Sequence, residues 1–211
     1  DLFDATQNLD CFVSVSNALK TCAVNLSKFS NDLRLLSSGP RTGLHEINLP
    51  AKQNGSSIMP GKVNPVIPEV VTQVAYLVIG HDTTITMAAE AGQMELNAFE
   101  PVLFYNIFES IETLTGAVNT LTNNCVTGIT ANEKECRSYV EHSVGISTAL
   151  CPYIGYKKSA EIAKLSLKTG RTVKEIVLSE KLLSENQLNE ILNPVNLTEP
   201  ENEIETIAKA M

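Results

Sequence analysis

The sequence predicts an all-α protein in which long helices form a bundle and shorter helices form a small second domain. Apolar residues recur at steps of three and four along stretches of about 25 residues, the period of an amphipathic helix. The second half instead carries helix-start signals at short intervals. No strand-like alternation competes along the 211 residues. We therefore expect a helical-bundle domain over residues 1–127 and a small helical domain over residues 128–211.

The first predicted helix is defined by one apolar stripe that ends before Gly39-Pro40. Its members follow alternating steps of three and four without a gap: Phe12, Val15, Leu19, Cys22, Leu26, Phe29, Leu33 and Leu36. This is the heptad period of a helix that packs nearly parallel to long neighbours. Glycine followed by proline is a typical helix stop.

Two further long helices are predicted after a non-periodic segment that spans residues 39–65. Asn64 and Pro65 are expected to be the N-cap and the first residue of the second helix, which runs to about Ala89 and is apolar on most faces. A third helix follows Pro101, with its stripe at Leu103, Ile107, Ile111, Leu114, Val118 and Leu121. Three helices of about 37 Å cannot cover one another's apolar faces. Other chains, or sequence absent from this one, must cover them, and we expect an oligomer.

Shorter helices are predicted beyond about Gly128, where three capping boxes occur. They are Thr130 to Glu133, Thr172 to Glu175 and Ser184 to Gln187, and Gly170 is a candidate C-cap between two of them.

Composition argues against several classes of protein. The net charge is −8 and no basic stripe is interleaved with aromatic residues, which disfavours a nucleic-acid surface. The most apolar run, Val66 to Ala89, contains charged and polar residues and so indicates a buried helix, not a membrane span. Five cysteines without paired spacing favour a reducing compartment over a disulfide or zinc framework, and the cytoplasm is the expected location. No metal site is predicted.

The segment NGSSIMPGKVNP, residues 54–65, gathers polar groups that could bind a small dianion. Lys62 offers a point charge, Asn64 an amide, and Ser56 and Ser57 hydroxyls beside the flexible Gly55. The following helix start adds free N–H groups and the positive end of a dipole. The same residue types are common in ordinary surface loops, so the residues alone leave both interpretations open.

The run GSSIMPGKVNP resembles the GSSxMPxKxN signature of the aspartase/fumarase superfamily, whose members cleave C–N or C–O bonds and release fumarate. The resemblance extends through NDLRLLSSGPRTGLHEINLP, VNPVIPEVV, GHDTTITMAAEAGQMELN and GITANEKE, essentially the whole chain. The runs GLHEINLP, NPVIPEVV and AAEAGQMELN are more similar to aspartases than to class II fumarases. The resemblance thus implies reversible elimination of ammonia from L-aspartate to give fumarate. The alternative is the hydration of fumarate to malate by a class II fumarase.

The resemblance also implies roles for five residues. Ser56 would be the general base that removes a proton and creates an aci-carboxylate intermediate. Ser57, Lys62 and Asn64 would bind the dicarboxylate substrate, and Glu69 would pair with an active-site histidine. No cofactor and no metal are implied.

Family members are homotetramers whose active sites are shared between subunits, and the resemblance implies the same here. The chain corresponds to the C-terminal half of such an enzyme: the latter part of the central helical domain and the small C-terminal domain. The histidine and the residues that hold the other end of the substrate belong to earlier segments, so this chain alone is expected to be inactive. A third hypothesis therefore stays open, in which the chain is an oligomerising helical module without catalysis.

Overall fold

The computed structural model describes residues 1–198 and confirms the all-α class. The chain divides into two units between Asn132 and Glu133, where the sequence predicted a division after residue 127. Residues 128–132 lie with the first unit because they include a short strand that pairs within it.

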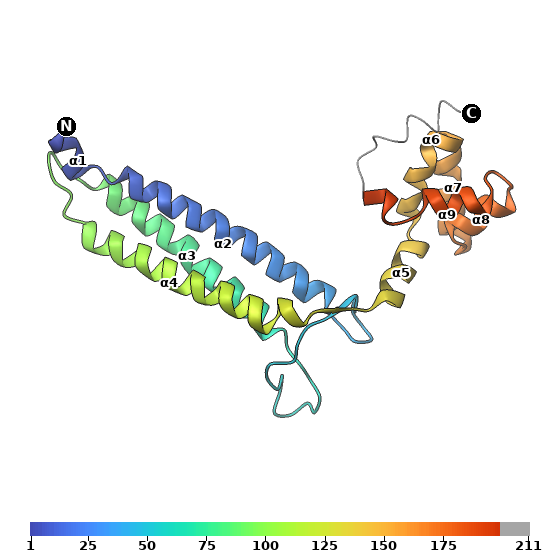
Figure 1. Ribbon diagram of the computed structural model, residues 1–211, viewed down its shortest axis with the longest axis horizontal. Helices are drawn as coiled ribbons and strands as arrows, with labels where there is room; N and C mark the ends of the chain where they lie inside the picture. The colour runs from blue at the N-terminus through green and yellow to red at the C-terminus, as the bar shows by residue number, and fades with distance from the viewer. Residues whose placement is uncertain (199–211) are drawn as a thin grey trace. The chain divides into compact units, whose positions relative to one another are not determined.

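Three long antiparallel helices dominate the first unit (Figure 1). After α1 (Leu2–Gln7), they are α2 (Asp10–Leu36), α3 (Val66–Glu90) and α4 (Glu100–Asn124). Helix α3 packs against both α2 and α4, which contact each other little. Their core includes Ala23, Leu33, Val71, Ala75, Val78, Ile85, Leu103, Ile107, Leu114 and Leu121. No helix within residues 1–198 is long and apolar enough to cross a membrane.

The buried face of α2 differs from the predicted apolar stripe. Its buried positions are mostly small residues, namely Ser16, Ala23, Ser27 and Ser30, with Leu33. Alternate members of the stripe, Val15, Cys22 and Phe29, are exposed in the single chain. Small side chains allow two helices to approach closely, so α2 packs against α3 through its small residues. Three of the eight residues of the apolar stripe are exposed.

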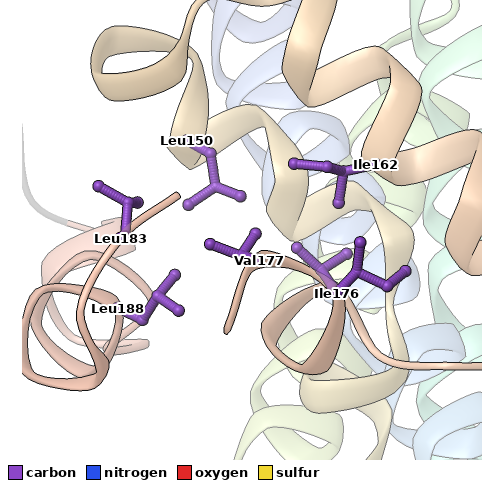
Figure 2. Close-up of a cluster of buried hydrophobic side chains, with 7 residues drawn as sticks. Leu150, Ile162, Ile176, Val177, Leu183 and Leu188 are labelled. Atoms are coloured by element: carbon purple, nitrogen blue, oxygen red, sulfur yellow. The ribbon is translucent and has the colours of Figure 1, made fainter. Parts of the chain in front are cut away.

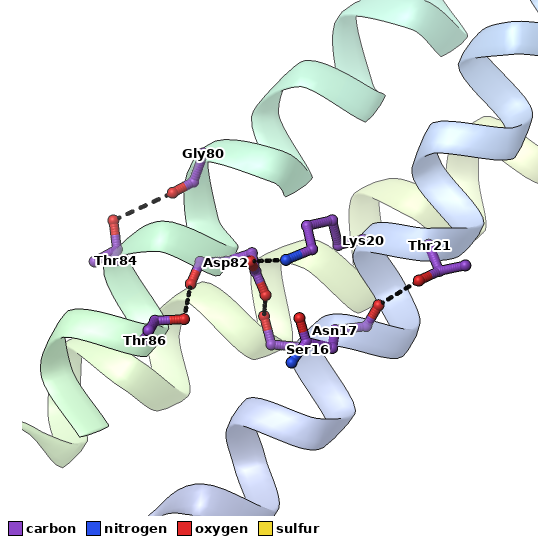
Figure 3. Close-up of polar contacts among 8 residues, drawn as sticks. All are labelled: Ser16, Asn17, Lys20, Thr21, Gly80, Asp82, Thr84 and Thr86. Atoms are coloured by element: carbon purple, nitrogen blue, oxygen red, sulfur yellow. Dashed lines mark hydrogen bonds and ion pairs between the residues drawn. The ribbon is translucent and has the colours of Figure 1, made fainter. Parts of the chain in front are cut away.

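A buried polar cluster joins α2 to α3 (Figure 3). Asp82 is 6% exposed, and its Oδ1 accepts a hydrogen bond of 2.7 Å from the Ser16 hydroxyl. Its Oδ2 lies 2.5 Å from Nζ of Lys20. Both carboxylate oxygens are therefore satisfied, which a buried charge requires.

The two ends of the bundle differ. Helix α2 ends, α3 begins and α4 ends at the same end, which we call the loop end and which carries residues 37–65. There, β1 (Ile47–Asn48) pairs antiparallel with β2 (Thr130–Ala131), just after the 3-10 turn η1 (Val126–Gly128). The predicted capping box from Thr130 to Glu133 is wrong: Thr130 lies in β2, and its hydroxyl accepts a hydrogen bond from Asn48 Nδ2 at 3.1 Å.

The second unit consists of short helices around one apolar core (Figure 2). They are α5 (Glu133–His142), η2 (Val144–Leu150), α6 (Cys151–Ile154), α7 (Tyr156–Thr169), α8 (Val173–Ser179), α9 (Glu185–Ile191) and η3 (Asn196–Thr198). The core is formed by Leu150, Ile162, Val173, Ile176, Val177, Leu183 and Leu188.

Local signals in the second unit follow the sequence prediction. The capping boxes from Thr172 to Glu175 and from Ser184 to Gln187 are confirmed, with both reciprocal hydrogen bonds present in each. Gly170 ends α7 in the left-handed conformation, as expected.

Candidate active site

The segment NGSSIMPGKVNP forms a loop at the loop end of the bundle, and its two ends are joined by hydrogen bonds. We call this loop, residues 54–65, the lobe. At its base, Gly55 N–H donates to the carbonyl of Lys62 at 2.7 Å, and Asn54 forms a β-bridge with Val63. Asn64 Nδ2 donates to the carbonyl of Gly55 at 3.1 Å. These contacts bring four of the five predicted site residues onto one lobe.

The predicted N-cap role of Asn64 is wrong. Helix α3 begins at Val66 with Pro65 at the N-cap position, and no side chain among residues 1–198 caps it. The Asn64 amide instead bonds the Gly55 carbonyl across the base of the lobe. The polar side chain thus satisfies a loop backbone group in place of the helix end.

Ser56 follows Gly55 at the base of the lobe and is half-buried. Its Oγ accepts hydrogen bonds from the backbone N–H groups of Ile58 and Met59, each at 3.2 Å. Two fixed donors on one hydroxyl oxygen favour its negatively charged form, because hydrogen bonds to the charged form stabilise it. The sequence reasoning identified the serine but not these two backbone donors.

Ser57 and Lys62 are exposed at the surface of the lobe. A turn closed by Lys62 N–H and the Met59 carbonyl, with Gly61 at φ +79°, precedes the lysine. Within residues 1–198 the Lys62 ammonium has no carboxylate partner. Ile58 at the tip is 84% exposed, so the lobe presents an apolar tip beside an unpaired cation.

The base of the lobe requires glycine at position 55. A Cβ on Gly55 would lie 2.7 Å from the Lys62 carbonyl oxygen and 3.1 Å from Asn64 N. Both neighbours are backbone atoms, which cannot move aside as a flexible side chain can. This close approach of the backbone requires glycine at the position next to Ser56.

Glu69 lies in the first turn of α3, outside the lobe. Its Oε1 is 3.9 Å from Nη2 of Arg34, in the last turn of α2, and both side chains are partly exposed. No histidine within residues 1–198 is paired with it. Arg34 was not among the residues predicted from the sequence. The only available signal was a single basic residue in the last turn of a predicted helix.

Positive charge in the first unit gathers near the lobe. Its six cations all fall between residues 20 and 62, and α3 and α4 contain none. Four of them, Arg34, Arg41, Lys52 and Lys62, belong to the loop end or the adjacent helix turn. Within the first unit, an approaching anion therefore meets most of the positive charge at the end that carries Ser56. In the described part of the chain, no group of three or more His, Cys, Asp or Glu side chains is arranged to hold a metal ion.

The chain matches two family models, Lyase over residues 1–80 and Fumarase C C-terminus over residues 146–199. It is similar to the aspartate ammonia-lyase of Helicobacter pylori, at 58% identity over 95% of this chain and 43% of that protein. Among solved structures, it is similar to a fumarate lyase:delta crystallin from Brucella melitensis, with 53% identity and a TM-score of 0.85 over 93% of this chain and 43% of that one. A recombinant class II fumarase from Schistosoma mansoni shares 36% identity with a TM-score of 0.87 over 95% of this chain and 42% of that one.

The chain spans less than half the length of the curated relatives that it matches. The similarity nevertheless covers both units, and the two family models together match more than half of the residues. The chain therefore belongs to the aspartase/fumarase superfamily.

Proposed function

We propose that the complete protein is an aspartate ammonia-lyase, which eliminates ammonia from L-aspartate to give fumarate. The observation that carries this proposal is the Ser56 hydroxyl, whose oxygen accepts two backbone N–H groups at 3.2 Å on a lobe that also bears Lys62. The identity to aspartate ammonia-lyases, 52–58%, exceeds the 36% identity to a class II fumarase and supports the choice of substrate.

Ser56 acts as the general base in this mechanism. Its alkoxide removes the proton from the carbon next to the β-carboxylate, and the electron pair of that C–H bond moves into the carboxylate to form an aci-carboxylate. When the aci-carboxylate collapses, its electron pair forms the C=C bond of fumarate, the C–N bond breaks, and the protonated amino group leaves as ammonia. A serine hydroxyl is a weak base in water, so its charged form must be stabilised. The N–H groups of Ile58 and Met59 supply this stabilisation without reorganisation, because the backbone holds them in place.

Ser57, Lys62 and Asn64 bind the carboxylate on which negative charge develops. The exposed ammonium of Lys62 and hydroxyl of Ser57 have room to meet a substrate oxygen. Asn64 uses one of its two amide hydrogens on the Gly55 carbonyl and retains the other. Electrostatic stabilisation strengthens when water is excluded, so the lobe closes over the bound substrate.

Glu69 pairs with a histidine that another segment supplies, and a homotetramer with shared active sites completes the pocket. Large apolar side chains exposed on the three long helices support this assembly: Val15, Phe29, Tyr76, Met87, Tyr105 and Phe108. Covering such side chains in an oligomer removes apolar area from water, which favours association.

The experiment compares L-aspartate with L-malate as substrates of the full-length enzyme, following fumarate by its ultraviolet absorbance. We expect fumarate from L-aspartate, with kcat/KM at least about 100-fold above the value for L-malate. A site whose polar groups pair with the amino group of L-aspartate leaves those groups poorly paired when a hydroxyl replaces it. The fold match to the fumarase, with its TM-score of 0.87, favours class II fumarase as the second candidate. Faster conversion of L-malate would establish that second function and exclude the first.

A further inference from the structure

A guanidinium faces the carboxylate that the mechanism uses at the start of α3. Arg34 Nη2 lies 3.9 Å from Oε1 of Glu69, and Nη1 of the same guanidinium donates to Asn31 Oδ1 at 3.2 Å. The guanidinium is planar, so a contact on one nitrogen fixes the direction of the other. Asn31 therefore holds Arg34 toward Glu69.

Stability alone does not explain this ion pair. The Arg34 and Glu69 side chains are 41% and 37% exposed, and ion pairs at such exposure contribute little to folding. The same two helices are already joined by the Lys20–Asp82 pair, whose carboxylate is buried. What distinguishes Arg34 is its place at the loop end, in contact with a residue of the proposed mechanism.

We infer that Arg34 is a positioning residue for Glu69, an inference that rests on the proposed function. The positive charge of the guanidinium lies on the Oε1 side of the carboxylate, at an ion-pair distance longer than a hydrogen bond, and its attraction for that oxygen favours one orientation of the carboxylate. Within residues 1–198 no group donates to the other oxygen, Oε2. That oxygen is left to accept the imidazole N–H which the proposed mechanism brings from another segment. Arg34 thus acts on catalysis through Glu69 and does not itself contact the substrate.

The test is a double-mutant cycle in the full-length enzyme, with Arg34→Gln, Glu69→Gln and the combined variant assayed for fumarate formation from L-aspartate. We expect Arg34→Gln to lower kcat by about 10- to 100-fold with KM changed by less than about twofold, since loss of orientation affects the reacting geometry. In the combined variant kcat should fall no further than in Glu69→Gln alone, because both changes remove one function. Arg34→Lys keeps the charge without the fork and should restore part of kcat.

Lys28→Gln is the matched control, because Lys28 forms an exposed ion pair with Asp32 on the same helix and does not contact Glu69. Its kcat should equal that of the wild type, and the unfolding temperatures of Lys28→Gln and Arg34→Gln should agree. The positioning role is overturned if Arg34→Gln behaves like Lys28→Gln, or if the two kcat losses multiply in the combined variant. A wild-type enzyme that makes no fumarate would instead overturn the proposed function, and the positioning role with it.

Discussion

Removal of the Lys20 charge should destabilise the bundle strongly, because it leaves the Asp82 carboxylate buried without its cation. The Asp82 side chain is 8% exposed and that of Lys20 is 35% exposed, with 2.5 Å between Oδ2 and Nζ. Breaking a fully buried ion pair costs about 3–5 kcal/mol. Partial exposure of the lysine and the remaining Ser16 hydrogen bond place Lys20→Met near the lower limit, at about 3 kcal/mol.

The assay is equilibrium urea unfolding of the full-length protein, followed by far-ultraviolet circular dichroism. The exposed Lys28–Asp32 pair on the same helix provides the control, and Lys28→Met should cost only about 0.3–0.5 kcal/mol. The double variant Lys20→Met/Asp82→Asn also removes the buried charge. Its free energy of unfolding should be at least about 1 kcal/mol higher than that of Lys20→Met alone. If Lys20→Met costs no more than Lys28→Met, the Asp82 carboxylate is not isolated from water and the reasoning is refuted.

Three smaller predictions concern other parts of the first unit. The buried Ser30 Oγ has no hydrogen-bond partner within residues 1–198, so Ser30→Ala should be neutral or stabilising by up to about 1 kcal/mol. Ser16→Ala should destabilise by about 1–3 kcal/mol in the same urea assay. Gly55→Ala should lower kcat/KM for L-aspartate by at least about tenfold without changing helical content, because its Cβ would strike the backbone at the base of the lobe. Burial raises the pKa of the Cys125 thiol above its ordinary value, so the unfolded state ionises first and stability should fall as the pH rises through the ordinary pKa of a cysteine thiol. Cys125→Ala should remove that part of the pH dependence; an unchanged slope would contradict the assignment.

Helix positions could be predicted closely from sequence because the apolar period is set by local geometry. The predicted stripe from Phe12 to Leu36 lies within α2, which runs from Asp10 to Leu36. Which face is buried could not be predicted in the same way. Val15 and Phe29 belong to the same stripe as Leu33, yet only Leu33 is buried in the chain. Apolar periodicity shows that a face of the helix will be buried, but it does not show which helix, of this chain or of another, will bury it.

Capping signals were reliable where no distant segment competed. The boxes at Thr172 and Ser184 form, whereas Thr130 is taken into β2 by pairing with β1, some eighty positions earlier. Asn64 likewise bonds the Gly55 carbonyl and does not cap α3. In both failures a tertiary hydrogen bond replaced the local one that the sequence pattern favoured.

The candidate site could be predicted to the level of residue identity but not of contacts. The motif located Ser56, Ser57, Lys62 and Asn64, and the structure brings them onto one lobe. The N–H donors to Ser56 are backbone groups, which no side-chain pattern reveals. The contact between Arg34 and Glu69 depends on α2 ending where α3 begins, a consequence of antiparallel packing.

The most direct test of the account is the rate of fumarate formation from L-aspartate by the full-length Ser56→Ala variant. Loss of a general base should lower kcat by about 10²–10⁴-fold. Helical content and unfolding temperature should stay at wild-type values, because among residues 1–198 the half-buried hydroxyl forms hydrogen bonds only within the lobe. A variant that folds normally and keeps wild-type kcat would contradict Ser56 as the base.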